Sequence, residues 1–242
     1  MNAPILLQAS GIVKRFGGFV ALEGVDLDIR PGERLGLIGP NGSGKSTLVN
    51  CIAGALLADE GSIIFDNEDV TRFAPHARAR RGIARSFQIP RPLTSMTVAQ
   101  NLHVPLRYAR RPPLSAAELA DAANEILRSV GLLHKSAHPA RGLTQVELRK
   151  LELARAIAMQ PRLLVADEAL AGLSGSEIEE ILALLLGLKE HGVAVLMIEH
   201  IMHAMMKFSE RIVVLMAGRK IADGDPRQVV QMSAVVKAYL GE

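Results

Sequence analysis

Hydrophobic and polar positions near the start of the chain predict a series of strands. The segment "VDLDI" (25–29) alternates apolar and polar residues, which is typical of a half-buried strand. "RLGLIG" (34–39) indicates a buried strand that runs into a glycine-rich turn, and a helix is expected to begin at Lys45. "SIIFDN" (62–67) and "IARSFQ" (83–88) also predict strands.

The middle of the chain changes to a helical period. Three segments, at 97–110, 115–131 and 146–160, carry apolar residues at helical spacing. An inserted all-helical subdomain is therefore expected over residues 89–160, inside a single domain of residues 1–242.

The last third of the chain returns to buried strands. "RLLVAD" (162–167), "VAVLMIE" (193–199) and "RIVVLMAG" (211–218) are nearly continuous apolar runs. A helix over 176–191 links the first two, as in a parallel sheet covered by helices on its faces. The expected fold class is α/β with a mostly parallel core sheet.

Composition narrows the class of protein. A chain of 242 residues with a net charge of +3 suits one domain and does not require a nucleic-acid partner. Residues 72–85 hold five arginines, a pattern that most often marks a solvated helix face. The longest apolar runs, 181–188 and 193–198, are shorter than the roughly 20 residues that span a bilayer. With no secretory signal and a single cysteine, Cys51, we expect a cytoplasmic protein without an internal disulfide.

The strongest chemical signal is "GPNGSGKS" (39–46), which fits G-x-x-x-x-G-K-[ST] between a predicted strand and a predicted helix. Its glycines let backbone N–H groups surround phosphate oxygens, Lys45 reaches the β- and γ-phosphates, and Ser46 offers a hydroxyl to Mg²⁺. A chance glycine turn is the alternative, and the strand–loop–helix context disfavours it. The expected nucleotide-binding residues of this loop are Gly39, Pro40, Asn41, Gly42, Ser43, Gly44, Lys45, Ser46 and Thr47.

A second motif, "LLVADE" (163–168), supplies the acidic residues that such a loop needs. Asp167 at the strand end is expected to hold Mg²⁺ through water, and Glu168 to polarise a water molecule against the γ-phosphate. A buried strand that merely ends in surface carboxylates is the alternative. Because no N-K-x-D guanine-reading motif occurs, ATP is favoured over GTP.

The motifs "GPNGSGKST", "SFQ", "LLVADE" and "IEH", in this order and spacing, resemble the ATP-binding cassette ATPases of ABC transporters over nearly the whole chain. "GIARSFQIPRPLTSMTVAQNL", "LRKLELARAIAMQP", "IEHIMHAMMKFSERIVVL" and the ending "AYLGE" are most similar to ATP-binding subunits of branched-chain amino acid importers. The resemblance implies the P-loop ABC ATPase fold, with an N-terminal antiparallel β subdomain beside the core sheet.

The resemblance also implies roles for residues outside the two motifs. Phe16 is expected to stack on adenine, Gln88 to link Mg²⁺ and the γ-phosphate to the helical subdomain, and His200 to contact the γ-phosphate. The alternatives are a core Phe16, a solvated Gln88 and a buried, satisfied His200. The expected catalytic residues are Lys45, Gln88, Glu168 and His200, and the expected metal ligands are Ser46, Gln88 and Asp167.

By the same resemblance, ATP closes a dimer of two cassettes, and hydrolysis reopens it to drive solute uptake. The expected partners are a second ATPase subunit, membrane-spanning permease subunits and, indirectly, a solute-binding protein. The chain is then peripheral on the inner face of the cytoplasmic membrane. Two rivals remain: a subunit that binds ATP without useful hydrolysis, and a nucleic-acid-associated ATPase that uses residues 72–85.

One stretch departs from the family pattern. The family usually has Leu-Ser-Gly-Gly-Gln, or a variant such as Leu-x-Tyr-Gly-Gln, at the start of a helix that contacts the ATP of the opposite subunit. Here the positions after Leu143 are Thr144, Gln145, Val146 and Glu147. A carboxylate about 5 Å from one phosphate charge, at an effective dielectric near 20, costs roughly 3 kcal/mol, or about a hundredfold in affinity. T-x-x-E is also a capping box, so helix capping is favoured over phosphate contact here.

Three further positions differ from the family. Ala169 replaces the proline that follows the catalytic glutamate, and Ser174 replaces the aspartate of the loop that contacts the other subunit. Ile201 replaces the aspartate that often follows the histidine at the position of His200. The residues that act within the subunit are intact, whereas those that act across the dimer have changed. The sequence therefore predicts a heterodimer in which a different chain supplies an ordinary glycine-rich helix start.

Overall fold

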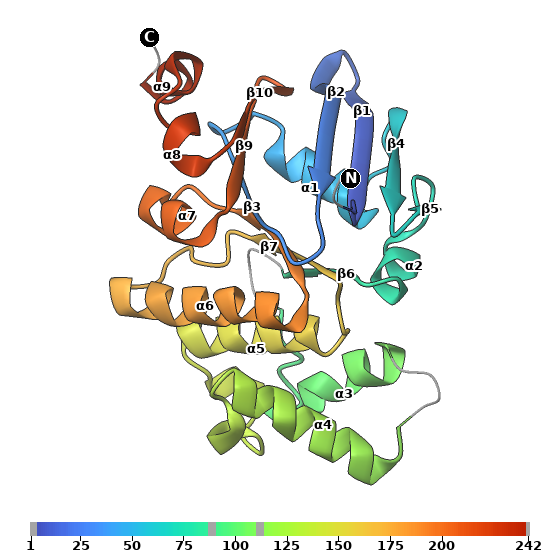
Figure 1. The fold of residues 1–242 in the computed structure, drawn as a ribbon. Helices are drawn as coiled ribbons and strands as arrows, with labels where there is room; N and C mark the ends of the chain where they lie inside the picture. The colour runs from blue at the N-terminus through green and yellow to red at the C-terminus, as the bar shows by residue number, and fades with distance from the viewer. Residues whose placement is uncertain (1–3, 87–90, 110–113, 241–242) are drawn as a thin grey trace.

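The computed structural model describes residues 4–86, 91–109 and 114–240, and a six-stranded sheet forms its centre (Figure 1). Neighbouring strands are parallel except at one edge, where β9 and β10 form a hairpin, so the predicted mostly parallel core sheet is confirmed. In spatial order the strands are β10 (Arg219–Gly224), β9 (Arg211–Met216), β3 (Arg34–Ile38), β8 (Ala194–Ile198), β7 (Leu163–Asp167) and β6 (Ile83–Ser86).

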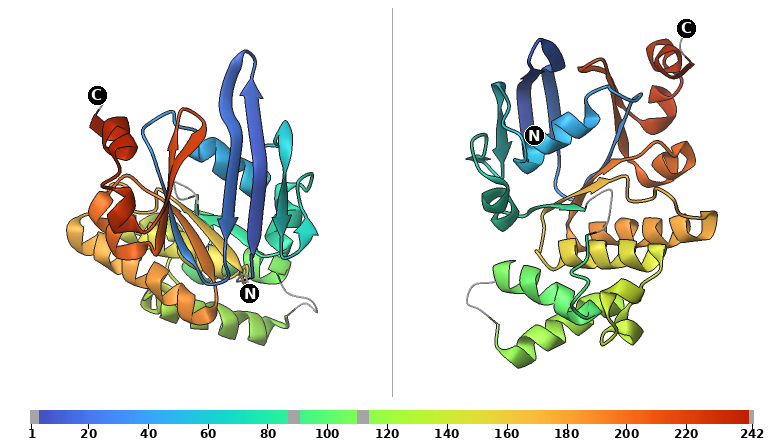
Figure 2. Two further views of the ribbon diagram at one scale, coloured as in Figure 1. Left: turned by 45° about the horizontal axis from the view of Figure 1, so that its top comes forward. Right: turned by 180° about the vertical axis from the view of Figure 1, so that it is seen from behind.

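A second, antiparallel sheet lies beside the core sheet, as the family resemblance implied (Figure 2). Its strands, in spatial order, are β2 (Phe19–Ile29), β1 (Leu7–Phe16), β4 (Glu60–Phe65) and β5 (Glu68–Asp69). The strand predicted over 25–29 begins earlier, at Phe19. Three register shifts in the β1–β2 ladder interrupt its alternation, because a bulge adds an unpaired residue to one strand.

The helix α1 (Lys45–Ala53) begins at the predicted residue and fills the space between the two sheets. Its Leu48, Val49, Cys51 and Ile52 are buried in one apolar cluster with residues of both sheets. The nucleotide loop before α1 is consequently attached to a helix that is held on two sides.

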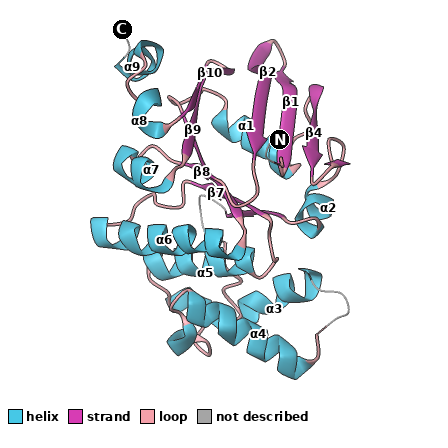
Figure 3. Ribbon diagram, in the orientation of Figure 1, coloured by secondary structure: helices cyan, strands magenta, loops and turns pink. Residues whose placement is uncertain are grey.

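The opposite face of the core sheet carries two layers of helix (Figure 3). The helices α5 (Gln145–Ile157) and α6 (Gly175–Gly187) lie next to the sheet, and α3 (Val98–Ala109) and α4 (Ala116–Ser129) form the outer layer. Leu153 of α5 packs in the sheet cluster while Leu151 packs with α3 and α4, so α5 joins the two layers. The other α-helices of the described residues are α2 (Pro75–Arg80), α7 (Met202–Phe208), α8 (Pro226–Val229) and α9 (Ser233–Leu240). None of the described helices has the length and apolar content needed to cross a membrane.

The arginine-rich segment 72–85 is not simply a solvated face, and that prediction is wrong for Arg78. Its side chain, on α2, is 1% exposed and donates hydrogen bonds to four backbone carbonyl groups. The acceptors are the carbonyl oxygens of Cys51, Ile52, Thr71 and Phe73. Two of these belong to the last turn of α1, whose final carbonyls have no partner within the helix. Arg78 thus acts as a buried cap of α1.

Two other arginines of this segment are also engaged within the chain. Arg81 forms an ion pair with Glu68, and Arg80 lies over the Tyr108 ring at 4.5 Å. These contacts weigh against the nucleic-acid rival, which needs the segment to face a phosphate backbone.

Candidate functional site

The nucleotide loop requires glycine at two positions. Gly39 and Gly44 have φ values of +150° and +104°, a region that favours glycine. A Cβ atom on Gly39 would lie 2.1 Å from the carbonyl oxygen of Leu215, and one on Gly44 would lie 2.7 Å from that of Ala21. The loop therefore passes against β9 and β2 with no room for a side chain.

The start of α1 is left open for a ligand. Its N-cap, Gly44, makes no side-chain cap, and its first turn contains no acidic residue. The first N–H groups of a helix lack partners within the helix and carry the positive end of its dipole. A glycine cradle before such a helix start suits a phosphate group.

Lys45 lies folded over the loop. Its Nζ donates hydrogen bonds to the carbonyl oxygens of Gly39 (2.7 Å) and Pro40 (2.9 Å). Burial lowers the pKa of Lys45, and the negative charges of Glu168 and Asp167 oppose that shift. The ammonium group thus feels the charges of both carboxylates of the second motif, and it can exchange its carbonyl partners for phosphate oxygens.

Asp167, at the end of β7, is held by an arginine. Its Oδ2 lies 2.7 Å from Nη2 of Arg85 on β6, and Nη1 of Arg85 donates to Oδ1 of Asn50 on α1 at 2.6 Å. Arg85 therefore ties the metal-side carboxylate to the helix that carries Lys45. The prediction that Arg85 belongs to a solvated face is wrong. The signal in the sequence was that Arg85 falls within a predicted strand, 83–88. The structure adds that this strand, β6, is parallel to β7, with Arg85 in register with Val165.

Glu168 follows in a strained backbone conformation, with φ of +48° for a residue that is not glycine. Its N–H donates to the carbonyl oxygen of Ile198 at 2.9 Å, which joins the loop after β7 to the end of β8. Strain of this kind persists only where the surroundings fix it and is concentrated at functional sites.

The residues expected to touch adenine and the γ-phosphate are exposed. Phe16, the last residue of β1, is 46% exposed, which excludes the plain-core alternative. His200 is also exposed, just after β8, so it is not a buried, satisfied imidazole. Their contacts with a nucleotide stay predictions. Gln88 lies outside the described residues.

The capping box predicted at the start of α5 is confirmed. Thr144 donates its N–H to Glu147 Oε2 (2.9 Å) and accepts from the Glu147 N–H through Oγ1 (3.4 Å). Glu147 Oε1 also lies 2.5 Å from Nζ of Lys135. Burial disfavours the charged carboxylate, yet the bonds from Lys135 and Thr144 outweigh it and hold the pKa of Glu147 below its usual value. Gln145 turns back within the chain, to the carbonyl oxygen of Ala171 at 3.4 Å.

A Mg²⁺ ion accompanies ATP in sites of this kind, and the donors here fit it. In the described part of the chain, no three His, Cys, Asp or Glu side chains form a group that could hold a metal. Mg²⁺ at nucleotide sites takes most ligands from phosphates and water, and only one or two from the protein. Ser46, in the first turn of α1, and Asp167, at the end of β7, are the residues that could supply those ligands.

Two family models match the chain. The model for the ABC transporter matches residues 22–171. The model for the branched-chain amino acid ATP-binding cassette transporter matches residues 219–242, which comprise β10, α8 and α9.

Two relatives that match over nearly the whole of both chains are named as branched-chain amino acid transport proteins. The high-affinity branched-chain amino acid transport ATP-binding protein BraF of Pseudomonas aeruginosa is 37% identical, and the match covers 100% of both chains. The probable branched-chain amino acid transport ATP-binding protein LivG of Archaeoglobus fulgidus is 36% identical over 98% of this chain and 95% of the relative.

Solved structures agree with the fold. The ADP conformation of MJ1267, an ATP-binding cassette of an ABC transporter, superposes with a TM-score of 0.90 at 35% identity, covering 99% of this chain and 100% of that one. A dimeric post-hydrolysis state of the cassette MJ0796, bound to ADP and Pi, has a TM-score of 0.82 at 28% identity, with 91% and 99% covered.

Proposed function

The chain belongs to the ABC transporter family of ATP-hydrolysing subunits, and on this premise we propose that it powers an importer for branched-chain amino acids or related small organic solutes. One observation carries the proposal: an open helix start behind a glycine cradle, with Lys45 folded over the loop by hydrogen bonds to the Gly39 and Pro40 carbonyl oxygens. The names of the relatives and the matched C-terminal segment support this solute class.

The proposed reaction is attack of water on the γ-phosphate of ATP. The backbone N–H groups of the loop and Lys45 hold the phosphates, so that Lys45 exchanges the Gly39 and Pro40 carbonyl oxygens for phosphate oxygens on binding. Ser46 and Asp167 would hold Mg²⁺, which neutralises developing phosphate charge. Glu168 orients the attacking water and accepts its proton, and His200 contacts the γ-phosphate from the end of β8.

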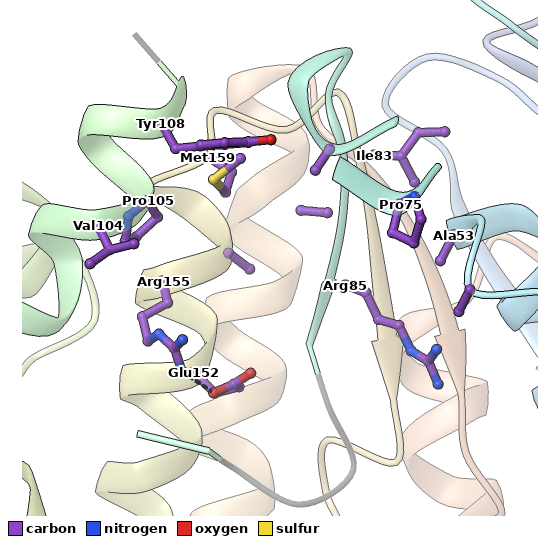
Figure 4. A pocket seen from close by; sticks show the side chains of 14 residues that line it. Ala53, Pro75, Ile83, Arg85, Val104, Pro105, Tyr108, Glu152, Arg155 and Met159 are labelled. Atoms are coloured by element: carbon purple, nitrogen blue, oxygen red, sulfur yellow. Dashed lines mark hydrogen bonds and ion pairs between the residues drawn. The ribbon is translucent and has the colours of Figure 1, made fainter. Parts of the chain in front are cut away.

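An apolar groove between α3 and the core is the surface we propose for the permease subunits, which place the chain at the inner face of the membrane. The groove encloses about 370 Å³ and includes Val104 and Tyr108 of α3, which are 55% and 36% exposed (Figure 4). Arg85, the partner of Asp167, also lines it. Patches of exposed apolar side chains are typical of interaction sites. Through Arg85, this groove adjoins the Asp167 side of the nucleotide site.

Replacing Val104 with glutamate is expected to weaken binding to the permease by about tenfold or more, because an unpaired carboxylate is costly to bury. The measurement is co-purification of the tagged chain with its permease. Val236→Glu on α9, which alters a valine 39% exposed, is the matched control. Equal loss in both variants would show that added charge, not the groove, is responsible.

We further propose that the chain works in a heterodimer. Thr144 caps α5, and Ser174 donates through N–H and Oγ to Glu177, each at 2.8 Å, at the start of α6. Both positions where the family contacts the opposite subunit are thus used for capping within this chain. Lys135 offsets part of the Glu147 charge, so the electrostatic penalty is below the roughly 3 kcal/mol of a bare carboxylate.

ATP hydrolysis by the purified chain, measured against its own concentration, tests the function and the heterodimer together. Wild type is expected to bind ATP but to hydrolyse it close to the Lys45→Ala blank. Glu147→Gln is expected to gain on the order of tenfold, since it removes a negative charge from the position where the family contacts the phosphate of the opposite subunit. Glu118→Gln is the matched control, because Glu118 has the same capping position in α4. Substantial wild-type activity that rises with concentration would identify a competent homodimer.

A further inference from the structure

The loop that carries Glu168 is pinned to the end of β8 by a buried side chain. The N–H of Leu170 donates to Oε1 of Glu199 at 2.8 Å, and the N–H of Glu168 donates to the carbonyl oxygen of Ile198 at 2.9 Å. Glu199 directly precedes His200 in the chain. The backbone segments that present Glu168 and His200 are therefore bonded to each other at two points.

Glu199 is an unusual residue for the core. It is 2% exposed, and within the described part of the chain its Oε2 has no hydrogen-bond partner. Burial raises the pKa of this carboxyl, while the Leu170 bond and His200 oppose the shift. A buried carboxyl is costlier than an apolar side chain of similar size, so packing alone does not account for it.

The same loop is also held from α5. The carbonyl oxygen of Ala171 accepts from Nε2 of Gln145 at 3.4 Å and from Nη2 of Arg149 at 3.3 Å. Residues 168–171 are thus fixed from the β8 side and from the α5 side. Glu168 keeps its strained φ of +48° because both sides constrain the loop.

We propose that Glu199 is a positioning residue, whose carboxyl fixes the backbone at Leu170 and so directs the Glu168 side chain towards the attacking water. The inference rests on the proposed role of Glu168. Glu199 acts through the backbone from within the core, and its loss is expected to lower kcat while the Kd for ATP stays the same.

The test compares Glu199→Leu with Glu199→Gln in the assembled transporter. The leucine variant removes the acceptor for Leu170, and kcat is expected to fall on the order of 100-fold, because small misplacements of a reacting group have effects of this size. The glutamine variant keeps an acceptor oxygen in an uncharged side chain and is expected to restore most of the rate. Hydrogen exchange of the Leu170 amide in the purified chain is expected to be at least about tenfold faster in Glu199→Leu only.

Glu33→Leu is the control for general destabilisation, because Glu33 is a buried carboxylate before β3, at the opposite end of the core sheet. It is expected to leave kcat and Leu170 exchange unchanged. Three results would each overturn the proposal: a wild-type kcat in Glu199→Leu, a Leu170 amide that is unprotected from exchange in the wild-type chain, or a loss of kcat in Glu199→Gln equal to that in Glu199→Leu. Glu168→Gln is measured alongside: if it hydrolyses ATP normally, the role of Glu168 fails, whatever the Glu199 variants do.

Discussion

Glu168→Gln is expected to lower the rate of ATP hydrolysis by roughly 10²–10⁴-fold, the range that a positioned general base contributes. The amide keeps the shape of the side chain but cannot accept the proton of the attacking water. ATP affinity is expected to stay near that of wild type or to increase, because one negative charge facing the phosphates is removed. The strained Glu168 backbone and its hydrogen bond to the Ile198 carbonyl oxygen fix where the side chain begins. From there the negative charge of Glu168 opposes the lowering of the Lys45 pKa by burial.

The measurement is kcat of the assembled transporter, together with the Kd of a fluorescent ATP analogue. Glu190→Gln, at an exposed position after α6, is the matched control and is expected to behave as wild type. Unchanged solute uptake with Glu168→Gln would instead support the rival in which this subunit binds ATP without useful hydrolysis.

Arg78→Met is expected to lower the free energy of unfolding by about 3–5 kcal/mol. Methionine fills a similar volume, but it removes the Arg78 hydrogen bonds to four carbonyl groups, of which the bonds to Cys51 and Ile52 are buried and those to Thr71 and Phe73 are half-buried. Hydrogen bonds to a charged group are stronger than neutral ones. Two of those carbonyl groups end α1, the helix whose other end forms the nucleotide loop. Loss of ATP binding is expected to accompany the loss of stability.

Urea unfolding followed by circular dichroism measures this effect. Arg81→Met, three residues further along, removes an exposed ion pair with Glu68 and is expected to change stability far less. Equal losses in the two variants would mean that Arg78 contributes as an ordinary surface arginine, contrary to its burial.

Local patterns were enough to predict several features of the site. The start of α1 at Lys45 and the Thr144–Glu147 capping box were both predicted correctly, because each depends on residues within a few positions of one another. Apolar runs predicted the core strands for the same reason. Periodicity failed where bulges disturb the β1–β2 ladder, since an inserted residue shifts the alternation.

The sequence by itself determined the glycine-rich loop before α1, the acidic pair Asp167 and Glu168 at the end of β7, and the capping box at the start of α5. Only the tertiary structure decided what surrounds them. Arg85 reaches Asp167 across 82 positions, Arg78 reaches the end of α1 across 27, and Glu199 reaches Leu170 across 29. No local period encodes such pairs, because sheet order and helix packing choose which distant side chains meet, and burial then sets whether a charge is solvated or bound.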